Sequence, residues 1–96
     1  MFILDVIKKN RKAMLAIANR YGALEVKLFG SVARGTSTES SDVDLLVTMK
    51  PGSSLLDIIA IKQDLEDLLG RKVDVVTENS ISPYIKDEIL KEAVNL

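Results

Sequence analysis

The chain is organised around residues 28–47, which read Leu-Phe-Gly-Ser-Val-Ala-Arg-Gly-Thr-Ser-Thr-Glu-Ser-Ser-Asp-Val-Asp-Leu-Leu-Val. An apolar segment enters a Gly-Ser turn, a short polar segment follows, and a second apolar segment begins with Asp42 and Asp44. Side chains alternate between the two faces of a strand, so these two carboxylates are expected to project side by side. This order of parts indicates metal-assisted phosphate chemistry.

The two carboxylates would repel each other, and ionised groups beside a buried strand are costly unless a cation or a proton neutralises them. No lysine or arginine lies between Arg34 and Lys50 to do so locally. A divalent metal meets the requirement, and Mg2+ prefers carboxylate oxygens, especially where substrate phosphates complete its shell. The sequence therefore predicts that Asp42 and Asp44 are metal ligands.

A third carboxylate, Asp74, lies within another apolar segment at residues 72–77. If the two segments form neighbouring strands, three carboxylates converge, an arrangement that an apolar core would not otherwise favour. The alternative is that Ser41-Asp42 forms a turn or a cap and that Asp44 is merely exposed on an edge strand.

The Gly30-Ser31 turn is a candidate phosphate cradle, since glycine lets the backbone approach a ligand while the serine hydroxyl and neighbouring N–H groups donate hydrogen bonds. Residues 32–34 are expected to form a short helical turn after it. An ordinary strand-to-helix turn is the alternative, because both residue types are common in turns. For Arg34, contact with a phosphate or a partner competes with simple solvation of the loop.

Composition narrows the possible chemistry of the 96 residues, which we expect to form a single domain, 1–96. Cysteine and histidine are both absent, which removes disulfides, thiolate nucleophiles, histidine bases and the usual zinc sites. A net charge of -1 argues against a long nucleic acid as a ligand. No signal peptide or membrane-spanning run is recognisable, so we expect a soluble, cytoplasmic protein.

Hydrophobic periodicity predicts alternating helices and strands. Helices are expected at residues 2–20, from Ser53 or Ser54 to Gly70, and from Tyr84 to about Val94, and strands at residues 24–29, 42–49 and 72–77. The helix between the last two strands allows a parallel crossover, whereas the short connection at residues 35–41 allows an antiparallel pair. The fold class is therefore α/β, with a small mixed β-sheet covered by helices.

Packing can be assigned to several side chains on the same basis. In the first strand, Leu24, Val26 and Leu28 are expected on one face. Tyr21 and Tyr84 are interpreted as packing residues with exposed hydroxyls.

The spacing of Gly30-Ser31, ten residues, and Asp42-Val43-Asp44 resembles the signature of the nucleotidyltransferase superfamily that includes DNA polymerase beta. The fuller run, Gly-Ser-x-Ala-Arg-Gly with Ser-Asp-x-Asp-Leu, is similar to its minimal nucleotidyltransferase branch, of the antitoxin type found in pairs with HEPN toxins. The resemblance implies the polymerase beta palm-like fold, and Asp74 lies where the third carboxylate of the family belongs.

The resemblance also implies roles for individual residues. Asp42 and Asp44 would bind two Mg2+ ions that hold ATP, and Asp74 would share a metal and act as general base on the acceptor hydroxyl. Ser31 and the Gly30 turn would contact the phosphates, with Arg34 as a further nucleotide-binding candidate. Two metals clamp the attacking and leaving oxygens of an in-line displacement, so nucleotidyl transfer requires no histidine.

By the same resemblance, the partner is a HEPN-type toxin ribonuclease, and the reaction transfers AMP to one of its tyrosines. The chain would then be an antitoxin, in a homo- or hetero-oligomer. Two alternatives stay open: a non-catalytic module that neutralises its partner by masking it, and nucleotidyl transfer to a small molecule or an RNA end.

Overall fold

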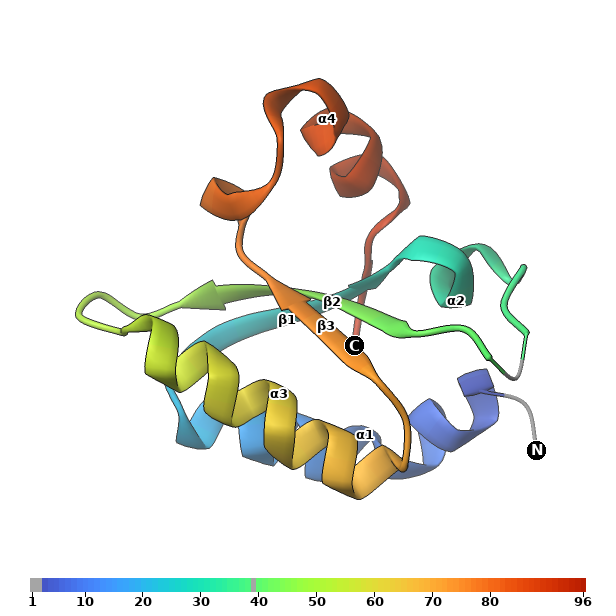
Figure 1. The fold of residues 1–96 in the computed structure, drawn as a ribbon, viewed down its shortest axis with the longest axis horizontal. Helices are drawn as coiled ribbons and strands as arrows, with labels where there is room; N and C mark the ends of the chain where they lie inside the picture. Colours follow the sequence, from blue (N-terminus) through green and yellow to red (C-terminus); the bar gives the residue numbers. More distant parts are fainter. Residues whose placement is uncertain (1–2, 39) are drawn as a thin grey trace.

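The computed structural model describes residues 3–38 and 40–96 (Figure 1). In this part of the chain four α-helices, a short 3-10 helix and four strands alternate along the sequence. Their bounds are α1 Ile3–Arg20, β1 Ala23–Phe29, α2 Gly30–Arg34, β2 Val43–Met49, α3 Leu55–Leu69, β3 Val73–Val76, η1 Glu78–Ser80, α4 Pro83–Glu92 and β4 Val94–Asn95. The first position of the predicted helix at 2–20 lies outside the described residues.

The four strands form one mixed sheet in the order β3-β2-β1-β4. Strands β1 and β2 are antiparallel, and β3 runs parallel to β2 because α3 carries the chain back between them. Strand β4 pairs antiparallel with the last part of β1. The predicted fold class, a small mixed sheet with helices, is confirmed.

Helices α1 and α3 lie together on one face of the sheet, whereas α4 lies on the other side (Figure 1). Alternate residues of the central strand β2, Val43, Leu45 and Val47, are each 0% exposed and belong to the core. Met14 from α1 and Ile61 from α3 belong to the same core. Because side chains alternate along a strand, Asp44 therefore projects from the opposite face of β2.

Helix α3 begins and ends where the sequence predicts. Ser54 is its N-cap residue, and the Ser54 N–H donates to the Asp57 carboxylate at 3.0 Å. Gly70 follows the last turn with a φ of 68°, a left-handed conformation that glycine adopts without strain. The N–H of Gly70 closes the helix on the carbonyl of Glu66 at 2.8 Å.

The predicted packing of the first strand is wrong at Leu24, which is 69% exposed. The β1–β2 register shifts between Ala23 and Glu25, so the strict alternation assumed for this strand fails at its start. Ala23 enters the core in place of Leu24, while Val26 and Leu28 are buried as expected.

The C-terminal region also differs from the prediction. Helix α4 ends at Glu92, and Val94 belongs to β4. The predicted packing of Tyr84 is wrong, because this side chain is 95% exposed. The hydroxyl of Tyr21 donates to Asp64 at 2.8 Å, which raises the pKa of this tyrosine.

In residues 3–38 and 40–96, no helix combines the length and apolar character needed to cross a bilayer.

Candidate active site

Two of the three predicted carboxylates come from neighbouring parallel strands. Asp44, the second residue of β2, is aligned with Asp74, the second residue of β3. On the other side of β2, Asp44 is aligned with Phe29, the last residue of β1. The sheet therefore places Asp44 between Asp74 and the turn that begins at Gly30.

The Asp44 carboxylate is held in an environment that disfavours its charge. Partial burial raises the pKa of Asp44 to about 6, and the neighbouring carboxylate of Asp74 adds to this by repulsion and by hydrogen bonding. Asp42 raises it further, whereas Arg34 acts in the opposite direction. The site therefore lacks enough positive charge of its own to balance its carboxylates.

Gly30 lies directly against Asp44. Its φ is +75°, a left-handed conformation, and a Cβ atom placed on it would come within 3.1 Å of the Asp44 Cγ and closer still to Oδ2. A side chain at this position would therefore displace the carboxylate. The structure gives a physical reason for glycine here, namely that only a bare backbone leaves room for Asp44.

The residues after Gly30 form α2, a helix of five residues that begins at the end of β1. Ser31 is its second residue and is partly exposed, and Arg34 is its last. The Arg34 guanidinium forms an ion pair with Glu92 at the end of α4, with an Nη1–Oε1 distance of 3.1 Å. The same Glu92 oxygen accepts a hydrogen bond from the Gly30 N–H at 3.3 Å.

Asp42 lies immediately before β2 and is exposed, so it stands outside the strand that holds Asp44. It borders an open groove together with Asp74. The groove runs along the C-terminal half of α3 and is lined by Asp42, Lys62, Glu66, Asp67, Gly70, Arg71, Lys72 and Asp74. Among the residues that the structure describes, no three acidic side chains converge as they stand into a group that could hold a metal ion.

The residues present nevertheless fit a hard divalent cation. Asp44 and Asp74 offer oxygen ligands side by side, and the pKa of Asp44 is raised first by burial and then by the neighbouring carboxylates of Asp74 and Asp42. Mg2+ usually binds through one or two carboxylates and completes its shell with substrate phosphates and water. Two aligned aspartates, with Asp42 beside them, meet that requirement.

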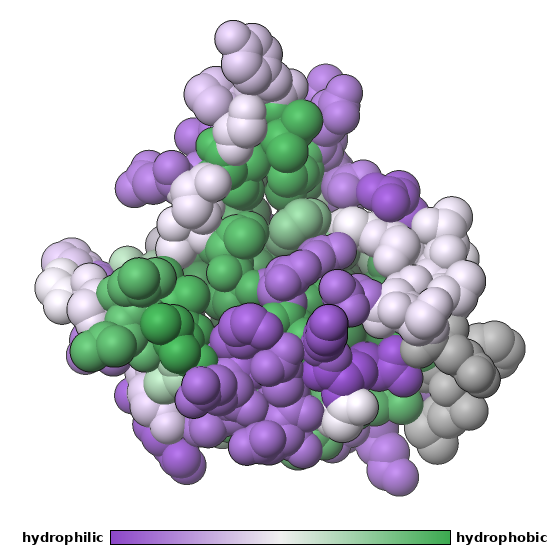
Figure 2. Space-filling model, in the orientation of Figure 1, coloured by the Kyte–Doolittle hydropathy of each residue, from purple (hydrophilic) through white to green (hydrophobic). Residues whose placement is uncertain are grey.

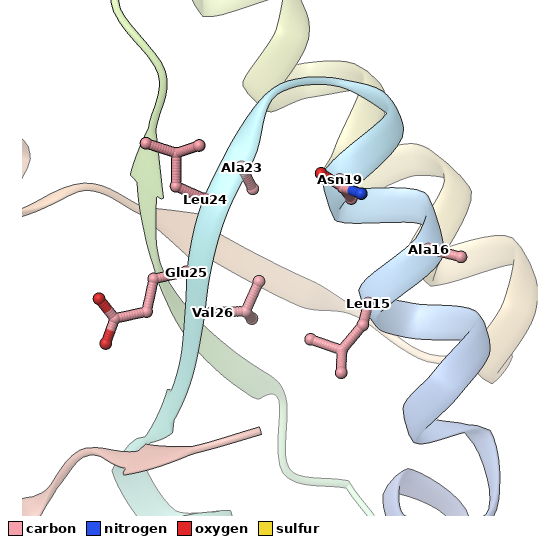
Figure 3. Close-up of a pocket in the computed structure, with 7 residues that line it drawn as sticks. All are labelled: Leu15, Ala16, Asn19, Ala23, Leu24, Glu25 and Val26. Carbon is pink, nitrogen blue, oxygen red and sulfur yellow. The ribbon is translucent and has the colours of Figure 1, made fainter.

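A second pocket lies at the opposite end of β1, between that strand and α1 (Figure 3). Leu15 points from α1 toward the strand beside Val26, whereas Leu24 and Glu25 project from the other side of β1 (Figure 3). The pocket is lined by Leu15, Ala16, Asn19, Ala23, Leu24, Glu25 and Val26. This lining contains a single carboxylate, no basic residue and none of the predicted site residues, so it does not suit phosphate chemistry.

Comparison with known proteins identifies the family. Residues 7–96 match the model of the nucleotidyltransferase domain, and the chain belongs to this family of enzymes. A Methanocaldococcus jannaschii protein, named as a proposed protein adenylyltransferase, is 43% identical over 94% of this chain and 97% of its own length. The protein adenylyltransferase MntA of Thermococcus cleftensis is 41% identical over 81% of this chain and 79% of its own length.

Solved structures agree with the fold. One described as a proposed minimal nucleotidyltransferase superposes with a TM-score of 0.88 at 43% identity, covering 99% of this chain and 97% of that chain. A toxin-antitoxin crystal structure with AMP-PNP gives a TM-score of 0.76 at 22% identity, covering 90% of this chain and 71% of that chain. The resemblance to the minimal nucleotidyltransferase branch is thereby confirmed.

Sequence reasoning did not single out Glu92. This residue contacts Gly30 and Arg34 across 62 and 58 positions of sequence, and it lies in an ordinary run of charged and apolar helix residues. Local spacing carries no signal of such a contact. The pairing of β4 with β1, which the sequence does not predict, places the end of α4 near this turn.

Proposed function

We propose that this nucleotidyltransferase transfers AMP from ATP to a tyrosine hydroxyl of a partner HEPN-type toxin in the cytoplasm, and so acts as an antitoxin. The observation that carries the proposal is the aligned pair of Asp44 and Asp74, with the pKa of Asp44 raised to about 6. The names of the relatives as protein adenylyltransferases support the choice of a protein acceptor.

Each site residue has a distinct task in this proposal. Asp42, Asp44 and Asp74 would hold Mg2+, which when bound supplies charge that stabilises the phosphate oxygens. Gly30 and Ser31 orient the triphosphate, and Asp74 accepts the proton of the attacking hydroxyl. The acceptor oxygen forms a bond to the α-phosphorus as the bond to the pyrophosphate leaving group breaks.

The proposed partner and nucleotide rest on relatives. The fold neighbour with AMP-PNP is itself described as a toxin-antitoxin complex. For this chain we infer the same pairing, with residues 1–96 acting as one domain and the partner supplying the acceptor. The absence of cysteine from this sequence is compatible with the proposed cytoplasmic location.

Transfer can be tested with ATP labelled on the α-phosphate, the purified partner and either Mg2+ or EDTA. We expect label on the partner only with wild type and Mg2+, and at least a hundredfold less with Asp44→Asn, since the loss removes a proposed ligand of the Mg2+ that would stabilise the reacting phosphate. Asp87→Asn removes an exposed carboxylate of α4 and serves as the matched control. Undiminished labelling by Asp44→Asn would refute the assigned site.

A second candidate function, masking of the partner without catalysis, is favoured by exposed apolar side chains. Leu55, Leu56 and Tyr84 are 70%, 75% and 95% exposed. Figure 2 shows apolar residues gathered over the start of α3 and near α4. The test uses the variant in which Asp42, Asp44 and Asp74 are all changed to Asn. If this variant protects cells from the toxin as well as wild type does, masking alone is sufficient for protection. Loss of protection with unchanged partner affinity excludes it.

A further inference from the structure

Glu92 occupies hydrogen-bond donors of Gly30 and Arg34, the first of which the proposed function assigns to the nucleotide and the second of which the family resemblance makes a nucleotide-binding candidate. Its Oε1 accepts from the Gly30 N–H at 3.3 Å, and both of its carboxylate oxygens lie 3.1 Å from the Arg34 Nη1. A carboxylate and a phosphate both present anionic oxygens to such donors. An incoming phosphate that used Gly30 and Arg34 would therefore meet Glu92 already in place.

The charge of Glu92 opposes the same ligand. Gly30 lies between the carboxylates of Asp44 and Glu92. The Asp44 carboxylate lies against its α-carbon, and the Glu92 carboxylate accepts a hydrogen bond from its N–H. The Glu92 side chain is only 28% exposed, so water screens it less than a fully solvated charge. A polyphosphate approaching this turn experiences repulsion from Glu92 in addition to competition for its donors.

The element that carries Glu92 is weakly anchored. None of the ten residues of α4, all of which the structure describes, is buried. Beyond its end, β4 pairs with β1 at two positions, Lys27 with Asn95 and Leu28 with Val94, and the Leu96 N–H donates to the Val26 carbonyl at 3.1 Å. Segments with few buried contacts open at low free energy, so Glu92 can leave the turn without unfolding the core.

We propose that Glu92 is an internal competitor of the nucleotide, whose carboxylate must leave Gly30 and Arg34 before a triphosphate can bind there. The inference rests on the proposed function, because it concerns the same site. It makes Glu92 a determinant of nucleotide affinity, and it couples the position of α4 to occupancy of the site. A partner that draws α4 away would raise that affinity.

The test is the affinity of the full chain for ATP with Mg2+, measured by calorimetry for wild type and Glu92→Gln. The amide keeps the size of the side chain and removes its charge. An exposed ion pair contributes up to about 1 kcal/mol, so we expect Glu92→Gln to bind ATP roughly two- to fivefold more tightly. Asp87→Asn, which removes one charge from the same helix, should leave the affinity near that of wild type.

Arg34→Gln, alone and together with Glu92→Gln, completes a double-mutant cycle for ATP affinity. This variant should bind ATP more weakly, and adding Glu92→Gln to it should give a smaller gain than in wild type, because one of the contested donors is gone. An affinity of Glu92→Gln that is unchanged or weaker overturns the inference, since Glu92 would then be a structural tie or would position Arg34 for the phosphate.

A measurement on wild type keeps the test independent of the variants. On titration with ATP and Mg2+, the NMR signals of the Gly30 amide and the Glu92 carboxyl carbon should shift together. A shift of Gly30 with no change at Glu92 contradicts displacement. If wild type binds no ATP, the proposed function fails and the inference falls with it, whereas binding without an effect of Glu92 overturns the inference alone.

Discussion

The α-carbon of Gly30 lies against the carboxylate of Asp44, so closely that a methyl group on Gly30 would collide with it. This contact joins the two parts of the sequence pattern, the Gly-Ser turn and the paired aspartates. The sheet sets this contact, because the turn begins directly after Phe29, and Phe29 is aligned with Asp44 on the neighbouring strand. The turn and the carboxylate are therefore built as one unit.

Gly30→Ala should destabilise the protein more than Gly35→Ala. The two glycines have nearly the same φ, 75° and 76°, but a Cβ on Gly35 meets nothing within 4 Å. Both substitutions incur about 1 kcal/mol of left-handed backbone strain, and only Gly30→Ala adds the collision with Asp44. Urea unfolding of the two variants measures the difference. In a protein that already carries Asp44→Ala, Gly30→Ala should lose most of its extra destabilisation, because the carboxylate is gone. If Gly30→Ala costs the same free energy of unfolding with Asp44 and with Ala at position 44, the collision is ruled out.

Asp44→Asn should stabilise the metal-free protein at neutral pH. The unfolded chain releases this proton near the ordinary pKa of 3.8, whereas the folded protein releases it at about 6, so the ionised form disfavours folding. Stability lost by wild type as pH rises through this window is retained by the variant. Since Asp44 is partly exposed, we expect a gain of only about 1 kcal/mol.

Unfolding in EDTA near pH 4 and near pH 7.5 tests this prediction. The gain should be present at the higher pH and should be much smaller at the lower one, where the folded wild type still carries the proton and the unfolded chain keeps part of it. Asp87→Asn is the control for loss of one negative charge. A variant less stable than wild type at both pH values would show that the Asp44 carboxylate stabilises the fold instead.

Mg2+ should raise the melting temperature of wild type. A ligand that binds only the folded state contributes about 1.4 kcal/mol at tenfold excess over its dissociation constant, or roughly 6–11 °C for a domain of this size. The shift should shrink near pH 5, because protons compete for Asp44. It should also be lost in Asp74→Asn but kept in Asp87→Asn. An equal shift in all three proteins would mean that the ion binds elsewhere.

The register shift in β1 makes opposite predictions for two leucines of the same strand. Leu28 is 3% exposed and Leu24 is 69% exposed. Leu28→Ala should lower the free energy of unfolding by about 2–5 kcal/mol, and Leu24→Ala by less than about 0.5 kcal/mol. Chemical denaturation compares them directly. A large loss for Leu24→Ala would place that side chain in the core, as simple alternation predicts.

Much of the fold could be predicted from the sequence because its signals are local. The switch from helical to alternating periodicity located the main elements, and Gly70 ended α3 as expected. The mixed sheet followed from the lengths of the connections. The exposure of Leu24 could not be predicted, since it depends on a register shift against β2 that leaves no mark in β1 itself.

The site was predictable in part for the same reason. The spacing of Asp42 and Asp44 is local, and Asp74 was singled out because aspartate is unfavourable in an apolar strand. The contacts of Glu92 and the strand β4 depend on tertiary pairing with β1 and could not be read from nearby residues. Tyr84 was misjudged because an apolar ring at a helical position indicates packing only if another element covers it.

We propose that Asp44 belongs to a site that adenylylates a partner protein. The most direct measurement is the intact mass of the protein that co-purifies with wild type, compared with that captured by the variant carrying both Asp42→Asn and Asp44→Asn in the same cells. We expect a partner heavier by whole AMP units with wild type alone. An unmodified partner, captured equally by both forms, would contradict it.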